Sequence, residues 1–275
     1  MTNPVLERFP RLRRVTNTPV FQRALSIGRQ HRLVEARTRF IAGELRGGTR
    51  CHRLAVDPDH FVVVRHRTHD MEIFDEIFRP PSIYAPPPRA ATALQAIAAS
   101  RALRVLDLGA NVGLFGVYIL SWYPDVELIS YEPESENLAV LKACVARNGK
   151  VKWEIVEACA MTTDEVTRIT GGRFADSFVS DVGAEVAGVD VLPLLSRYDY
   201  VKMDIEGSEW PILDDPRWTQ AMREVSVFVL EWHTRGCSVP NARAAAIAAV
   251  ESAGFISAPS PPGWEHGLVW GWRQA

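Results

Sequence analysis

Paired cysteines are missing from this sequence. Its cysteines are few and far apart, and no Cys-x-x-Cys pair occurs. This pattern excludes the usual structural zinc sites. A chain of 275 residues can build a sizeable core without a disulfide framework, so we expect reduced thiols in a cytoplasmic protein. The cysteines are Cys51, Cys144, Cys159 and Cys237.

The sequence also has no long apolar run and no strong net charge. No stretch approaches the roughly 20 apolar residues of a membrane helix, and the first residues hold no apolar signal core. The formal net charge is −2, so we predict neither a membrane nor a nucleic-acid partner. The first 50 residues are locally basic, which indicates either the solvated face of a helix or a patch for an acidic partner.

Dinucleotide-binding enzymes carry Gly-x-Gly-x-x-Gly after their first strand, and this sequence does not. Instead, an apolar run ends in Asp107 and is followed by Gly109-x-Asn111-x-Gly113 and an apolar helix. The two glycines permit positive φ and a close approach of backbone to a ligand. The segment resembles the first motif of class I S-adenosylmethionine (SAM) methyltransferases, which implies that Asp107 reaches the ammonium group of SAM directly or through water. A plain turn capped by Asn111 is the alternative.

A second apolar strand ends in Glu132-Pro133, 25 positions after Asp107. An acid at the end of the second strand can accept hydrogen bonds from both ribose hydroxyls of a nucleoside. A surface carboxylate is the alternative interpretation of Glu132. After the third strand, Ala160 and Met161 are placed to line the adenine, although core packing explains the methionine equally well.

Two further strands end in polar residues. Residues 198–203 lead into Asp204-Ile-Glu206-Gly-Ser-Glu209, and residues 225–230 lead into Glu231-Trp-His233. Parallel strands are normally apolar throughout, so acids at their exits indicate the ligand edge of a sheet. Because strand exits lie side by side, we expect these groups to converge on one crevice with Glu132.

From residue 90 onward, strands and helices alternate. We predict an α/β, Rossmann-like class I methyltransferase domain over residues 90–275, with a mostly parallel seven-stranded sheet and helices on both faces. Strands are expected near 105, 129, 153–156, 200–203 and 225–230, and residues 255–272 add an antiparallel hairpin at one edge. Residues 1–89 form an N-terminal appendage: a helix over 18–45 softened near Gly28, a hairpin over 54–64 around Asp-Pro-Asp, and a helix over 71–78. We expect this appendage to contribute to the site that binds the acceptor of the methyl group.

Together these segments resemble the FkbM family of SAM-dependent methyltransferases. The matching pieces are residues 107–113, 131–137, 202–209 and 230–233, within roughly half of the chain. The Asp-Ile-Glu-Gly element distinguishes that family from other class I enzymes. The resemblance implies methyl transfer to a hydroxyl group of a small-molecule acceptor such as a sugar or secondary metabolite. Some relatives methylate nitrogen, so N-methylation of a small molecule or peptide is the alternative.

An alcohol must lose a proton as it attacks the methyl group. A base with a pKa near 6.5 suits this step, which favours His233, and Asp204 competes because it leaves the strand nearest the methyl. Glu206 and Glu209 either orient the acceptor or stabilise the following helix. Asp204 and Glu206 resemble metal ligands, but no third ligand is evident, so no metal is predicted. A nicotinamide-dependent dehydrogenase and a non-catalytic SAM-binding protein are weaker alternatives.

Overall fold

The computed structural model describes residues 19–149, 151–171, 178–260 and 266–274. Its centre is a seven-stranded sheet in the order β12-β13-β11-β10-β3-β4-β5. These strands are β3 (Leu103–Leu108), β4 (Val126–Tyr131), β5 (Lys152–Val156), β10 (Tyr200–Met203), β11 (Val227–His233), β12 (Ile256–Pro259) and β13 (His266–Trp272). The first five run parallel, and β12 and β13 form the predicted antiparallel edge.

The strand order contains one topological switch. From β3 the chain moves outward through β4 and β5, and then returns to β10 on the other side of β3 and moves outward through β11. Connections on the two sides of such a point diverge, which opens a crevice at the carboxyl ends of the strands. The predicted α/β class with a large, mostly parallel sheet is therefore confirmed as a mixed sheet with an antiparallel edge.

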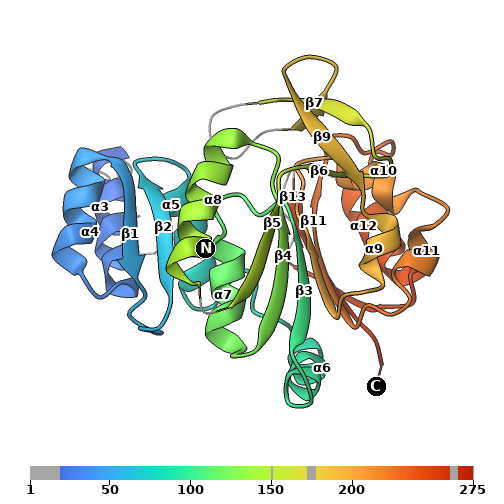
Figure 1. Cartoon of the computed structure of the whole chain (residues 1–275), viewed down its shortest axis with the longest axis horizontal. Helices are drawn as coiled ribbons and strands as arrows, with labels where there is room; N and C mark the ends of the chain where they lie inside the picture. Colours follow the sequence, from blue (N-terminus) through green and yellow to red (C-terminus); the bar gives the residue numbers. More distant parts are fainter. Residues whose placement is uncertain (1–18, 150, 172–177, 261–265, 275) are drawn as a thin grey trace, which may run out of the picture.

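Helices cover both faces of the sheet (Figure 1). One face carries α6 (Pro88–Ala98), α7 (Leu114–Trp122) and α8 (Ser135–Arg147), and the other carries α9 (Leu192–Leu195), α10 (Glu209–Leu213), α11 (Trp218–Ala221) and α12 (Ala242–Ser252). The central strands alternate accordingly: Val105 belongs to the first core and Leu106 to the second. None of the helices in the described ranges combines the length and apolar character needed to cross a membrane.

The N-terminal appendage packs on the outside of α7 and α8 (Figure 1). It contains α3 (Pro19–Gln30), a 3₁₀ turn (His31–Leu33), α4 (Arg37–Arg46), the antiparallel pair β1 (Gly48–Arg53) and β2 (Phe61–His66), and α5 (Asp70–Phe78). Its apolar residues belong to the same cluster as those of α7 and α8. The side chain of Asn148, after α8, accepts a hydrogen bond from the Phe61 amide at 3.0 Å and donates one to the Phe61 carbonyl at 2.8 Å. The appendage and the sheet therefore share one core.

Two expectations about the appendage differ from the structure in detail. The first helix, expected to be interrupted or softened near Gly28, is regular at that exposed position and is interrupted a few residues later: α3 ends at Gln30, a 3₁₀ turn follows, and Val34 forms an isolated bridge with Leu54. The first strand ends at Arg53 and does not include residues 54–56, because a wider loop is held by Asp57. The Asp57 carboxylate accepts from the Asp59 amide and bonds the His60 ring.

A small second sheet has no counterpart in the sequence-based prediction. It joins β6 (Cys159–Met161), β9 (Ala184–Asp190), β7 (Val166–Thr170) and β8 (Phe178–Ser180) in that order. It lies beyond the end of the main sheet in Figure 1. The three strands β7, β8 and β9 are mostly exposed or half-buried, so they lack the continuous apolar runs that identify buried strands.

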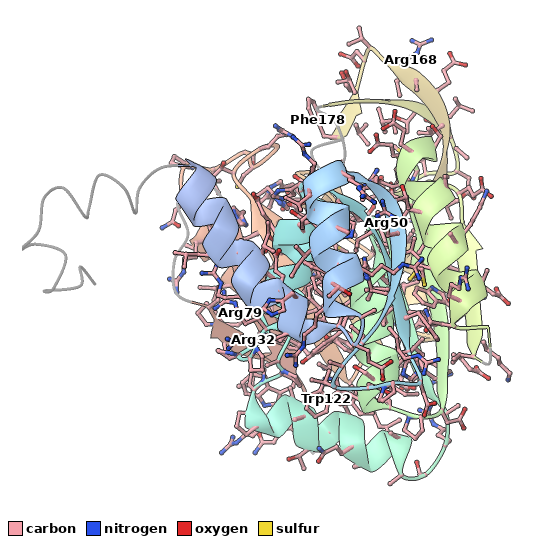
Figure 2. All side chains as sticks on the ribbon, turned by 90° about the vertical axis from the view of Figure 1, so that its left-hand side faces the viewer. Arg32, Arg50, Arg79, Trp122, Arg168 and Phe178 are labelled. Carbon is pink, nitrogen blue, oxygen red and sulfur yellow. The ribbon has the colours of Figure 1, made fainter. Side chains whose placement is uncertain are left out.

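Several arginines of the first helical segments of the appendage are on its outer surface. Arg29, Arg32, Arg37 and Arg39 are all exposed, and Figure 2, which views the molecule from this side, labels Arg32 and Arg79 there. Arg29 lies 4.0 Å from Asp75 at the edge of α5. These positions fit a solvated helix face. The basic residues before position 19 lie outside the described residues.

Candidate active site

A cavity of about 840 Å³ lies at the carboxyl ends of β3, β4 and β10, at the topological switch. Most of the residues predicted to form the site line it: Gly109, Asn111, Glu132, Pro133, Ala160, Asp204, Glu206 and His233. Asp107, Gly113 and Met161 do not line it. The sulfur of Met161 instead packs close to Gly188 of β9, which is the core-packing alternative.

The turn after β3 is shaped by close backbone contact. Gly109 has a φ of +87°, and an added Cβ would collide with the carbonyl oxygen of Asp204. Gly113, with a φ of +86°, begins α7 and packs under Leu141. The glycines are therefore required by neighbouring protein, whereas the sequence suggested approach to a ligand. Asn111 adopts a φ of +51°, and its Oδ1 is buried without a hydrogen-bond partner among the described residues.

Glu132 is a buried carboxylate that faces the cavity. It accepts the Asn111 amide at 2.7 Å and the Glu134 amide at 2.9 Å, and the Asn137 side chain lies 3.4 Å away. Burial raises its pKa to about 7 despite these donors. Oε1 takes the donors of Glu134 and Asn137, and Oε2 takes the Asn111 amide. With two acceptor sites on each oxygen, Oε2 keeps a site for a ligand donor, and Oε1 gains one when a ligand hydroxyl replaces the long Asn137 contact.

Asp107 is shielded from the cavity by Lys202. Asp107 has no exposed surface, and the Lys202 ammonium lies 3.3 Å from both Asp107 and Asp204. The same ammonium donates to the Gly109 carbonyl at 2.6 Å. Burial raises the pKa of Asp107, against the effect of Lys202; burial disfavours the charge of Lys202, but Asp204 and Asp107 outweigh it and raise its pKa. Asp107 therefore does not line the cavity, and its contact with the ammonium group of SAM, directly or through water, stays a prediction.

His233 lies at the end of β11, with its ring held by Glu209. Glu209 has no exposed surface; it accepts the His233 amide at 2.7 Å and lies 3.1 Å from Nδ1 of the ring. Burial lowers the pKa of His233, but the bond to Glu209 and the charges of Asp204 and Glu206 outweigh it and raise the pKa to about 9. This value is higher than expected for a neutral base. Glu209 does not line the cavity, so its role is to fix His233.

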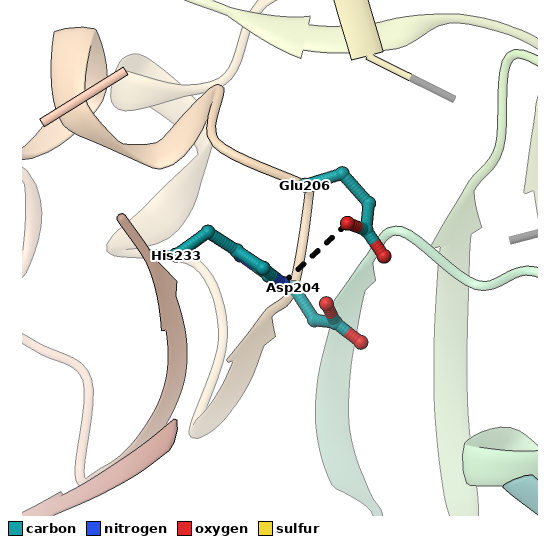
Figure 3. A group of neighbouring side chains, drawn as sticks. All are labelled: Asp204, Glu206 and His233. Atoms are coloured by element: carbon teal, nitrogen blue, oxygen red, sulfur yellow. Dashed lines mark ion pairs between the residues drawn. The ribbon is translucent and has the colours of Figure 1, made fainter. Parts of the chain in front are cut away.

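Three side chains converge on one point of the cavity wall (Figure 3). Asp204 and Glu206 follow β10, and His233 ends the neighbouring strand β11. One ligand atom from each lies within 4.8 Å of the others, and His233 Nε2 is 3.5 Å from Glu206 Oε2. Glu206 has a φ of +56°, a conformation that is costly for a residue with a Cβ and concentrates at functional sites.

Acidic side chains dominate the lining. Among the residues that the structure describes, six carboxylates line the cavity, against the two permanent cations Lys202 and Arg235. Such a wall attracts cationic ligands and disfavours anionic ones. The acids are Glu76, Glu132, Glu134, Asp204, Glu206 and Glu231.

Other lining residues come from segments that the sequence linked only weakly to the site. The appendage contributes Ile73, Ile77 and Tyr84, and the Tyr84 hydroxyl lies 3.5 Å from Asp204. The small sheet contributes Ile169 and Phe178. The guanidinium carbon of Arg235 lies 4.0 Å from the centroid of the Phe178 ring. His266 stacks on His233 with ring centroids 6.0 Å apart. In the sequence, the signal for the role of Lys202 is its position as a charged residue inside an otherwise apolar strand.

No protein-family model matches the chain, and no curated protein matches it. Among solved structures, it is similar to a precorrin-6y C5,15-methyltransferase from Geobacter metallireducens, with 12% identity, a TM-score of 0.42, and coverage of 73% of this chain and 95% of that one. A methyltransferase FkbM from Methylobacillus flagellatus shares 15% identity with a TM-score of 0.45, covering 62% of this chain and 43% of that one.

A SAM-dependent methyltransferase from Agrobacterium tumefaciens gives 13% identity and a TM-score of 0.45, covering 82% of this chain and 70% of that one. All three proteins are methyltransferases. The FkbM family suggested by the sequence motifs is not established by these similarities.

Proposed function

We propose that this protein is a SAM-dependent methyltransferase that acts on a hydroxyl group of a sugar or secondary metabolite. The observation that carries this proposal is the pairing of Glu132 and Asp204 on one cavity, at the ends of two strands that flank β3. Glu132 has the chemistry to accept two ribose hydroxyls, and Asp204 lies on the side where an acceptor would meet the methyl group.

The donors and acceptors of the cavity fit SAM. The surplus of carboxylates suits a ligand that carries a sulfonium and an ammonium group. The unpartnered Asn111 Oδ1 is available as an acceptor beside Glu132. Ala160 lines the same cavity where the adenine is expected. Asp107 is a positioning residue in this scheme, because it acts by fixing Lys202.

Bound SAM supplies a methyl group that is already electrophilic, so the protein must orient the acceptor, exclude water and take up a proton. Ile73, Ile77 and Tyr84 provide an apolar cover over Asp204. The acceptor oxygen forms a bond to the methyl carbon as the bond from carbon to sulfur breaks, and the hydroxyl proton passes to Asp204 or His233. Glu206 stands next to both and orients the acceptor.

The acidic lining also favours a second candidate, transfer to an amine. Six carboxylates would attract a cationic ammonium acceptor as well as SAM. An amine that reaches the site neutral needs little help from a base. N-methylation therefore predicts that Asp204 and His233 variants retain turnover, whereas O-methylation predicts that at least one of them loses it.

The test of SAM binding is calorimetric titration of the full chain and of Glu132→Ala. We expect the variant to lose about 1.5–3 kcal/mol of SAM affinity, the range for hydrogen bonds to a charged group. Glu136→Ala is the control, because Glu136 is an exposed acid in the first turn of α8, four residues after Glu132. Equal SAM affinity in folded Glu132→Ala and wild-type protein would contradict the assignment.

The test of the base is single-turnover methyl transfer to an acceptor found by screening hydroxyl compounds. Replacing the true base, Asp204 or His233, with Ala should slow transfer by roughly 10²–10⁴-fold while SAM still binds. If both single variants transfer the methyl group at the wild-type rate, neither residue is the base.

A further inference from the structure

We propose that Asp204, Glu206 and His233 form a binding site for one divalent transition-metal ion. Asp204 and Glu206 contribute carboxylate oxygens, and His233 contributes Nε2. The three ligand atoms lie within 4.8 Å of one another and face the cavity. Adjacent parallel strands hold them, since Asp204 directly follows β10 and His233 ends β11. The sequence did not suggest His233 as the third ligand, because 27 residues or more separate it from the acids.

The orientation of the histidine supports this site. Nδ1 faces the carboxylate of Glu209 at 3.1 Å, so a ring with a single proton keeps that proton on Nδ1, and Nε2, which lies 3.5 Å from Glu206, is the nitrogen that can bind a metal ion (Figure 3). Glu209 is itself fixed by the amides of Gly207 and His233, at 2.8 and 2.7 Å. A carboxylate that holds the far nitrogen of a histidine is the usual support of a metal ligand.

The surroundings favour a cation at this point. Glu231 lines the same wall, and its partner His266 stacks on His233. Lys202 lies 3.3 Å from Asp204, but its ammonium is also bound by Asp107 and the Gly109 carbonyl. It therefore orients Asp204 and is not one of the groups that meet at the cluster.

The ligand set selects the metal. Carboxylates alone suit Mg²⁺ and Ca²⁺, whereas an imidazole ligand favours ions such as Mn²⁺, Fe²⁺, Co²⁺ and Zn²⁺. Three protein ligands leave coordination positions that face the cavity. If the proposed methyltransferase function holds, those positions would receive oxygen atoms of the acceptor and place its hydroxyl beside the methyl group. The binding of the metal does not depend on that function.

The experiment titrates the metal-stripped full chain with Mn²⁺ and follows the electron paramagnetic resonance signal of the free ion. We expect one Mn²⁺ per chain. Asp204→Asn, Glu206→Gln and His233→Ala should each weaken binding by about 100-fold or more, and Glu209→Gln by roughly 10–100-fold through loss of orientation. Glu76→Gln is the matched control, because it removes an acid of the same cavity outside the cluster, and it should bind Mn²⁺ as wild type does.

Several outcomes overturn the site. Wild-type protein that binds no Mn²⁺, Co²⁺ or Zn²⁺ at one ion per chain excludes it, and this result needs no variant to fold. Retention of Mn²⁺ by all three ligand variants, with circular dichroism spectra like that of wild type, also excludes it. Displacement of Mn²⁺ by an equal concentration of Mg²⁺ excludes His233 as a ligand. SAM calorimetry on the same samples tests the methyltransferase proposal separately, so the two failures are distinguishable.

Discussion

Glu132 is buried, which favours its neutral form, but the proposed binding of SAM requires its ionised form. Burial raises its pKa to about 7, so the acid gains a proton near neutral pH in the ligand-free protein. A folded-state pKa above the ordinary value of 4.5 means that Glu132 contributes stability below pH 4.5, and this contribution is lost as pH rises through about 7. Ligand binding should have the opposite pH dependence, since only the ionised carboxylate accepts hydrogen bonds from both ribose hydroxyls.

We therefore expect SAM affinity to fall by about tenfold between pH 8 and pH 6, because the ionised fraction of an acid with a pKa near 7 falls by that factor. Calorimetric titrations at half-unit intervals measure the profile. Glu132→Gln, which cannot titrate, should bind SAM weakly and with little change across this range. An identical slope in wild type and Glu132→Gln would assign the pH dependence to another group.

At the scale of elements, the turn after β3 is the point where the main sheet meets the site. Gly109 lies against the backbone of Asp204 with a φ of +87°, so both sterics and backbone strain oppose any side chain. We expect Gly109→Ala to lower the free energy of unfolding by about 3 kcal/mol or more, by the mechanisms that produce the largest effects of single mutations. Urea denaturation measures the change.

Gly28 provides the comparison for this substitution. It lies in α3 with no atom within 4 Å of an added Cβ. Gly28→Ala should leave stability unchanged or raise it by up to about 1 kcal/mol through helix propensity. A loss in Gly109→Ala no larger than the change in Gly28→Ala would show that the turn relaxes around the new side chain.

The sequence predicted these elements to different degrees. Parallel strands such as β3 and β10 are short apolar runs that end in acids, and their positions agree with the structure within a few residues. The small sheet was missed because its strands are half-exposed and carry no clear alternation. At the site, motif spacing located Glu132, Asp204 and His233 on one cavity, but it could not show that Lys202 covers Asp107, or that Glu209 turns His233 toward Glu206. Those facts depend on side-chain packing between strands, which spacing does not encode.

At the scale of the whole molecule, one apolar cluster joins the appendage to α7 and α8. Removal of residues 1–89 would expose the faces of these helices, so we do not expect a stable core without the appendage. The full chain should unfold in a single calorimetric transition, with equal calorimetric and van't Hoff enthalpies. Two resolved transitions, with the first lost on truncation at residue 89, would show that the parts fold independently.

Low pH should reduce the stability of the folded chain through a histidine pair in the appendage. His52 and His66 are buried, with Nε2 atoms 2.8 Å apart, and Glu44 holds His66 at 2.7 Å. Burial, followed by the charge of His66, lowers the pKa of His52 from 6.5 to about 4. The unfolded chain therefore binds a proton that the folded chain excludes, and stability present above pH 6.5 is lost as pH falls toward 4.

We expect a loss on the order of 1–3 kcal/mol from His52 over this interval. Thermal unfolding of the wild type and of His52→Gln between pH 7 and pH 4 measures it, and the variant should show the shallower decline. Parallel declines in the two proteins would place the acid sensitivity elsewhere in the chain.

A line of polar contacts crosses from the appendage to Glu132 in the cavity wall. Asp70 holds Arg65 through paired bonds of 2.9 and 2.8 Å, and Arg65 donates to the oxygen of the Asn137 amide at 2.8 Å. That contact directs the amide nitrogen toward Glu132. The appendage is therefore not an interchangeable module for acceptor choice. If the proposed function holds, a chimera that exchanged residues 1–89 for those of a relative with another acceptor would have to keep an arginine at 65 and its acid at 70, or it would change the support of Glu132 together with the acceptor site.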